Sequence, residues 1–161
     1  MCNGPRRASR GSFPRVQRGA PTPDISSAET LTCALISADT IVVSESSSGI
    51  YFRTELLPKL GFREQVWPRV RTVADELPGF AVARGEARIV VEQLSELVVV
   101  DGVEVAGLLP ESLQQHLTVG VALGGGHPTR RGARELIAFL ASPQQRGVLR
   151  AAGMKPSTAA P

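Results

Sequence analysis

The feature that most restricts the fold is an alternation of short β-branched runs with helical patterns along residues 24–153. Residues 40–44 (TIVVS) and 89–91 (IVV) are almost continuously apolar, which is typical of strands buried inside a parallel sheet. Weaker strand patterns occur at residues 69–73, 103–106 and 117–123. The order of the elements predicts an α/β fold in which helices flank a largely parallel sheet.

The predicted helices have recognisable starts and stops. The first begins with a capping box in which the Ser26 hydroxyl accepts from the Glu29 amide. A second covers residues 50–60, where Pro58 should distort the last turn and Gly61 supplies a left-handed stop. The other helical patterns are a weak one at 74–83 and two near the end, at 129–140 and 142–153.

Positive charge is concentrated at the N-terminus. Residues 1–23 hold five arginines, four prolines and three glycines, so we expect a flexible basic tail there, and a frayed tail at 156–161. The rest of the chain carries 13 basic against 15 acidic residues, and only 4% of all residues are aromatic. Neither a basic face nor a stacking platform for nucleic acid is therefore predicted. The apolar runs are also too short for a membrane-spanning helix.

Residues 40–51 carry the most informative pattern for function. A buried strand leads through Ser46, Ser47, Ser48 and Gly49 into the start of a helix. Helix starts leave backbone N–H groups unpaired and carry partial positive charge, and serine hydroxyls add donors, so this arrangement suits a bound oxyanion. The alternative is that one serine caps the helix while the others are solvated.

A second polar position follows the run at residues 89–91. The Gln93 amide could face a ligand at the same edge of the sheet, or it could be an ordinary exposed side chain. Glu92 and Glu96 are interpreted as solvated surface, because an anion site would not place carboxylates nearby.

No catalytic constellation or metal site is predicted. His116 and His127 lie eleven residues apart, with no cysteine or acidic cluster at metal-ligand spacing. Ser47, Ser48 and Ser95 have no recognisable base beside them, so we predict that the protein is not an enzyme and uses no cofactor. The glycines at 124–126 fit a flexible connector better than a dinucleotide-binding loop.

Five groups of residues occur in a specific order and spacing. They are GAPTPDISSAETL (19–31), SSSGIYF (46–52) with LLPKLG (56–61), VARGEARIVVEQLSEL (82–97), GVEVAGLLPESLQ (102–114) and RELIAFLASPQQRGVLRAAGM (134–154). Together they resemble the molybdate-type periplasmic solute-binding proteins of ABC importers, which have the type-2 periplasmic-binding fold.

The resemblance implies two α/β lobes that close on an oxyanion. Within a folded region of residues 24–155, it assigns 38–118 to the second lobe and 128–153 to helices that return to the first. Nothing in residues 1–15 corresponds to the beginning of the first lobe, so the resemblance implies an N-terminally truncated receptor. The closing helices would then expose apolar side chains, namely Leu136, Ile137, Leu140, Val148 and Leu149.

The same resemblance gives roles to the candidate residues. Ser47, Ser48, Gly49 and Ile50 would donate to the ligand from the helix start, and Gln93 would contact it from the second lobe. The implied function is the substrate-binding component of an ABC importer for a small oxyanion such as molybdate, with a membrane permease as partner.

The implied location is periplasmic. Because no apolar export signal follows the basic start, a cytoplasmic location is the alternative. Two other functions stay open: the effector-binding module of a LysR-like regulator, which shares the two-lobe fold, and a non-functional fragment.

Overall fold

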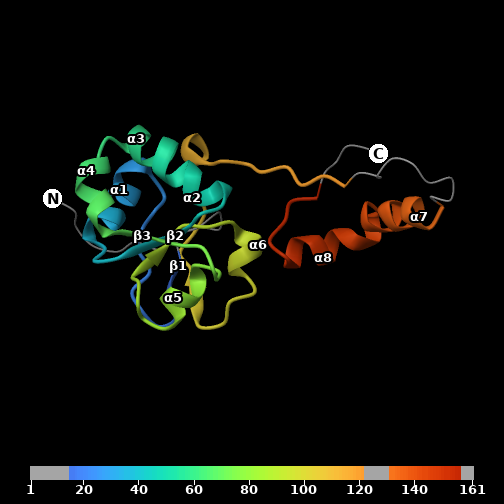
Figure 1. Ribbon diagram of the computed structural model, residues 1–161, viewed down its shortest axis with the longest axis horizontal. Coiled ribbons are helices and arrows are strands. Elements are labelled where there is room, and N and C mark those ends of the chain that lie inside the picture. The colour runs from blue at the N-terminus through green and yellow to red at the C-terminus, as the bar shows by residue number, and fades with distance from the viewer. Residues whose placement is uncertain (1–14, 122–130, 157–161) are drawn as a thin grey trace. The chain divides into compact units, whose positions relative to one another are not determined.

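The β-branched runs assemble into a five-stranded sheet with the strand order β3-β2-β4-β1-β5 (Figure 1). β2 pairs in parallel with β3 on one side and with β4 on the other, and Ile41 lies opposite both Val70 and Ile89. β1 runs antiparallel between β4 and β5. The predicted α/β fold with a largely parallel sheet is therefore confirmed. The strands are β1 (Arg15–Gln17), β2 (Ile41–Ser44), β3 (Val70–Val73), β4 (Ile89–Val90) and β5 (Val103–Val105).

The computed structural model describes residues 15–121 and 131–156. It divides after residue 115 into a first unit, which contains the sheet, and a second unit, whose described secondary structure is helical. In the first unit the helical elements are α1 (Ala28–Ser37), α2 (Ser47–Tyr51), η1 (Phe52–Leu56), α3 (Leu57–Leu60), α4 (Arg63–Val66), η2 (Trp67–Arg69), α5 (Gly79–Ala83), α6 (Leu94–Leu97) and η3 (Glu111–Leu113).

The sheet is buried on both faces. Ile41 and Val43 join one apolar cluster, whereas Val42 between them joins another. The first cluster includes side chains of α1, η1 and α3, and the second includes those of α5 and α6; Figure 1 shows these two sets of helices on opposite sides of the sheet. Each fully buried Leu or Phe contributes about 1.5–3 kcal/mol, so these clusters fix the strand register and the position of the strand ends.

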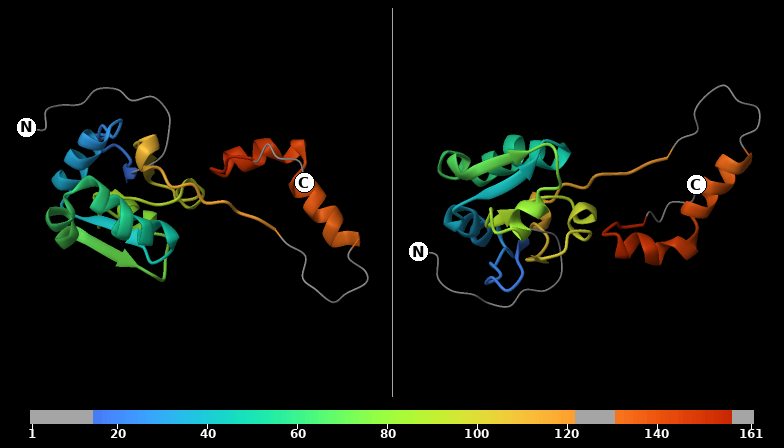
Figure 2. Two further views of the ribbon diagram at one scale, coloured as in Figure 1. Left: turned by 90° about the horizontal axis from the view of Figure 1, so that it is seen from above. Right: turned by 60° about the horizontal axis from the view of Figure 1, so that its bottom comes forward.

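The turn η3 returns to the first cluster near the end of the unit. Leu113 packs in that cluster, and the Tyr51 hydroxyl donates a 2.7 Å hydrogen bond to the Leu113 carbonyl. Figure 2 shows η3, in yellow-orange, lying against helices from the first third of the chain.

Two local predictions about helices need correction. The capping box of α1 uses Ser27 and Thr30 instead of Ser26 and Glu29. The predicted helix at 50–60 begins three residues earlier, at Ser47, and its middle is the five-residue π-helix η1. A proline ring in a helix conflicts with the carbonyl four residues before it, and the wider π turn just before Pro58 relieves that conflict. Gly61 ends the helix with φ +75°, as expected.

The basic segment is more ordered than its composition suggested. Residues 1–23 were expected to be a flexible tail, but β1 lies within them and Val16 is buried. The reason is tertiary: β1 supplies backbone partners for both β4 and β5. Residues 1–14 lie outside the described part of the chain.

The second unit contains α7 (Arg131–Leu140), η4 (Pro143–Gln145) and α8 (Arg146–Ala151). A strand was predicted at 117–123, but residues 117–121 form no strand, because they pair with no neighbouring strand. Residues 122–123 and the predicted connector at 124–126 lie outside the described ranges. The helices do expose Leu136, Leu140 and Val148. Within the described residues, no helix has the length and apolar character needed to cross a membrane.

Candidate functional site

The carboxyl ends of β2 and β4 bring two polar segments together. Because the strands are parallel neighbours, the chain leaves both at the same edge of the sheet. Ser44 is the last residue of β2 and leads into α2 through Ser46, while Glu92 and Gln93 follow β4. We call residues 44–49 the serine loop.

The serine loop is held by its own hydroxyls. Ser44 Oγ lies 2.7 Å from Ser46 Oγ and 3.1 Å from Ser48 Oγ, and the latter two are 3.1 Å apart. Gly49 packs so closely under Ser44 that a Cβ placed on it would lie 1.8 Å from the Ser44 carbonyl oxygen. The loop therefore needs glycine at this position.

The start of α2 retains free donors. Ser46 occupies the N-cap position, but its side chain makes no capping hydrogen bond. The Ser47, Ser48 and Gly49 amides are the first three of the helix and so have no intrahelical acceptor. Ile50 was expected to donate to a ligand as well, yet its amide donates 2.9 Å to the Ser46 carbonyl and its side chain is half-exposed. The Ile50 amide therefore makes the first hydrogen bond within the helix and is not free to donate to a ligand.

Glu92 is the buried polar residue at this edge that sequence reasoning missed. It was interpreted as solvated surface, but it is only 6% exposed. Its Oε1 accepts hydrogen bonds from the Ser48 hydroxyl and from the Gln93 amide, the latter at 2.9 Å. The missed signal was its position: it directly follows a buried apolar strand that neighbours the strand feeding the serine loop.

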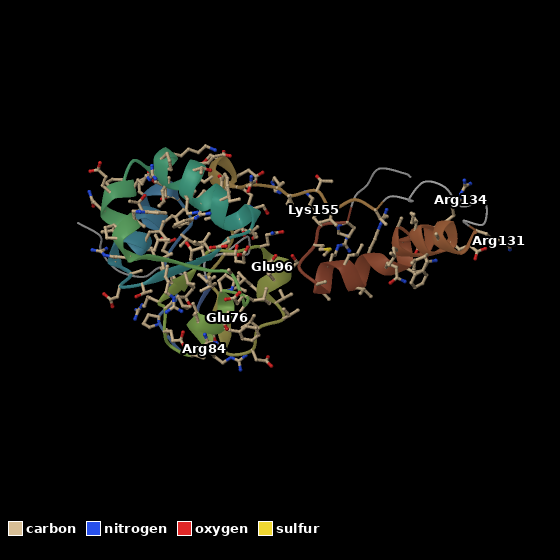
Figure 3. All side chains as sticks on the ribbon, in the orientation of Figure 1. Glu76, Arg84, Glu96, Arg131, Arg134 and Lys155 are labelled. Carbon is tan, nitrogen blue, oxygen red and sulfur yellow. The ribbon has the colours of Figure 1, made fainter. Side chains whose placement is uncertain are left out.

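Glu96 lies one helical turn further along, on α6 (Figure 3), and is half-buried. Burial, and then the negative charge of Glu92, raise the pKa of Glu96 above its ordinary value. Both carboxylates were expected to be solvated surface, whereas α6 places them near enough to interact.

Gln93 follows Glu92 at the carboxyl end of β4, the edge of the sheet at which the sequence predicted it. It is half-buried and is the N-cap residue of α6. Its backbone N–H donates a hydrogen bond to Oε1 of Glu92. The structure thus brings Ser48 and Gln93 to Glu92 at one edge of the sheet, with Ser47 and Gly49 next to Ser48 in the serine loop.

The other polar candidates do not join this site. Ser95 lies in α6, and His127 is outside the described residues. Among the residues described, no group of three His, Cys, Asp or Glu side chains is arranged to hold a metal ion.

Comparison with protein families and known proteins adds three findings. Residues 15–155 match the family of bacterial extracellular solute-binding proteins. An aconitate isomerase from a Pseudomonas species is 34% identical over 146 residues, which are 91% of this chain and 56% of that protein. The fold is also similar to the substrate-binding domain of a molybdenum ABC transporter from Clostridium difficile, with a TM-score of 0.70 and 17% identity, over 90% of this chain and 62% of that one.

These findings change one prediction. The sequence was interpreted as that of a non-enzyme, but a relative with 34% identity is named as an isomerase, so that prediction is wrong. That prediction considered only a serine nucleophile with a base beside it, and it took Glu92 for solvated surface. The chain spans little more than half the length of that relative and under two thirds of the solved structure.

Proposed function

The chain belongs to the bacterial extracellular solute-binding protein family, and we propose that it binds a small anionic solute at the serine loop. The observation that carries this proposal is the set of free amides at Ser47, Ser48 and Gly49, which lie at the start of a continuous helical run. Their N–H groups and the helix dipole favour negative charge there.

The ligand class follows from the donors. Backbone amides and serine hydroxyls donate to oxygen anions of any parent, so a tetrahedral oxyanion such as molybdate and an organic carboxylate both fit. We propose, as the resemblance of the sequence suggested, that the Gln93 side chain adds a contact from the neighbouring strand end. The shape of the site and the nearby Glu92 carboxylate then determine whether a tetrahedral oxyanion or an organic carboxylate is preferred.

The biological role proposed is that of a receptor that delivers its solute to an ABC-type membrane permease. The family is described as extracellular, which supports a location outside the cytoplasmic membrane. Recognition of a bound ligand by a permease requires a closed state, and the amides at the helix start would hold the ligand in it.

A second function, isomerisation of an unsaturated polycarboxylate such as aconitate, is favoured by one specific observation. A buried carboxylate, Glu92, lies beside the proposed anion site. A receptor for a fully deprotonated oxyanion gains nothing from such a group, whereas an enzyme that moves a proton needs one.

The binding test uses calorimetry and thermal unfolding of the whole chain. Molybdate, tungstate, sulfate, phosphate and trans-aconitate are compared at fixed ionic strength. A true ligand at a hundred times its Kd should stabilise the fold by about 2.7 kcal/mol. Ser48→Ala and Gln93→Ala should each weaken binding by about tenfold, the effect of losing one hydrogen bond to an anion.

Ser37→Ala is the matched control, because Ser37 lies at the end of α1, just before the opposite end of β2. Its affinity should equal that of the unmodified chain. If all five anions leave the unfolding curve unchanged, or if the Ser48 and Gln93 variants bind normally, the proposed site is wrong.

A further inference from the structure

The two carboxylate oxygens of Glu92 have different surroundings. Oε1 accepts two hydrogen bonds, from the Ser48 hydroxyl and the Gln93 amide. Oε2 is equally buried, yet it has no hydrogen-bond partner among the described residues. One oxygen is therefore held by the protein, and the other is buried without a hydrogen-bond partner.

A buried carboxylate oxygen without a hydrogen-bond partner is energetically costly. A buried acceptor without a partner costs about 1–3 kcal/mol, and more when it is charged. Such costs are concentrated at functional sites, where a ligand or a reacting proton supplies the missing interaction. Two donors on Oε1 also prevent the carboxylate from rotating, so Oε2 keeps one orientation at the edge that carries the serine loop.

The neighbouring Glu96 is compatible with this role. Its raised pKa, caused by burial and by Glu92, means that Glu96 retains its proton more readily than an exposed glutamate. A stronger hold on its proton reduces the negative charge that Glu96 adds beside an anion site.

We propose that Glu92 is a catalytic base that moves a proton between two carbons of an unsaturated polycarboxylate bound at the serine loop. The inference rests on the proposed anion site and deepens its second function. It adds to that function the reacting oxygen and the positioning partners, Ser48 and Gln93.

The proposed step balances without a cofactor. Oε2 takes a proton from a methylene carbon next to the double bond, so a C–H bond breaks and an O–H bond forms. The electron pair spreads over the three-carbon unit and its carboxylate groups. The proton then returns from Oε2 to the far carbon, and the double bond shifts by one position. The free amides of Ser47, Ser48 and Gly49 would bind a carboxylate of the substrate whose negative charge rises during the step. Hydrogen-bond donors lower a barrier most when they face the charge that develops in the transition state.

The test follows cis- and trans-aconitate with the full-length chain in D₂O by proton NMR, and measures their binding by calorimetry. The unmodified chain should interconvert the isomers or exchange their methylene protons for deuterium. Glu92→Gln keeps the shape and an acceptor for Ser48 but removes the base, so both rates should fall by about 10²–10⁴-fold, the usual contribution of a general base, while affinity changes by less than tenfold. Glu104→Gln, at an exposed position in β5, is the control and should match the unmodified chain.

Each outcome is decisive. Loss of turnover in Glu92→Gln with binding and unfolding temperature retained supports the proposal. Turnover at the unmodified rate in that variant overturns it. If the unmodified chain binds aconitate but neither isomerises nor exchanges it, the base role is wrong and the binding site stands. If it binds none of the anions, the proposed function itself fails and the base role fails with it.

Discussion

Substitution of Gly49 by alanine should damage the serine loop more than any other single added methyl group in the sheet unit. A Cβ at Gly49 would lie 1.8 Å from the Ser44 carbonyl oxygen and 2.8 Å from its carbon, and real contacts below 3.0 Å are essentially absent. The backbone of β2 or α2 must therefore move by about 1.2 Å to reach 3.0 Å. β2 is anchored by the fully buried Val43, and α2 continues directly into η1, whose first residue, Phe52, is also fully buried.

Forcing a methyl group into such a site costs about 1–3 kcal/mol, and the upper end applies because the obstacle is backbone. A loss of about 3 kcal/mol lowers Tm by about 12 °C or more in a unit of this size. Thermal unfolding monitored by circular dichroism gives this number directly. Ligand affinity should fall as well, because the amides of Ser47 and Ser48 move with the loop.

Two further glycines separate the clash from other effects of alanine. Gly61 has φ +75° but open space around its Cβ direction, so Gly61→Ala should show only conformational strain, about 1–2 kcal/mol. Gly120 has open space and no positive φ, so Gly120→Ala should be near neutral. If Gly49→Ala is no more destabilising than Gly61→Ala, the close approach of α2 to β2 described above is incorrect.

Two other predictions concern stability. The Arg84 guanidinium, bonded to Glu76 and Glu86 beside α5 (Figure 3), lowers the pKa of both carboxyls, that of Glu86 to about 2 with help from Arg71. A lowered folded-state pKa adds stability that is complete above pH 4.5 and is lost as the pH falls towards 2. Arg84→Met should therefore make the urea midpoint fall less steeply as the pH decreases over that range. Lys59→Met removes the surface ion pair with Glu55 and should leave the slope unchanged. Equal slopes for Arg84→Met and the unmodified chain would contradict this prediction. Tyr51→Phe leaves the Leu113 carbonyl without its donor in a buried setting and should cost about 1–2 kcal/mol by urea unfolding, and a variant as stable as the parent would show that this bond adds nothing.

The sequence predicted the strands correctly where the local residue pattern and the burial of the side chains favour the same structure. The strands at 41–44, 70–73 and 89–90 lie within one residue of their predicted limits, because β-branched apolar runs favour the same structure locally and in the core. The pattern failed at 117–121, where strand propensity finds no neighbouring strand to pair with. It failed also at β1, whose short run has little pattern of its own and is ordered by pairing with β4 and β5.

The candidate site was only half visible for a related reason. Serines and glycine before a helix form a local motif, so the loop could be predicted. Glu92 is 44 residues away from Ser48, and its meaning depends on parallel pairing that brings two strand ends together. The expectation that anion sites exclude carboxylates then favoured a solvated position for Glu92, and the base role proposed above would be an exception to that rule.

The position of β1 also has a consequence for how the chain acquires its fold during synthesis. Arg15 pairs with Val90 and Val105, which leave the ribosome 75 and 90 residues later. β1 must therefore wait, with Val16 uncovered, until β4 and β5 have been synthesised. β2, β3 and β4 can form a parallel sheet before that, but β5 has no partner without β1. Final closure of the sheet is thus a late event, and slow closure of this kind extends the time during which a nascent chain is open to aggregation or to capture by chaperones.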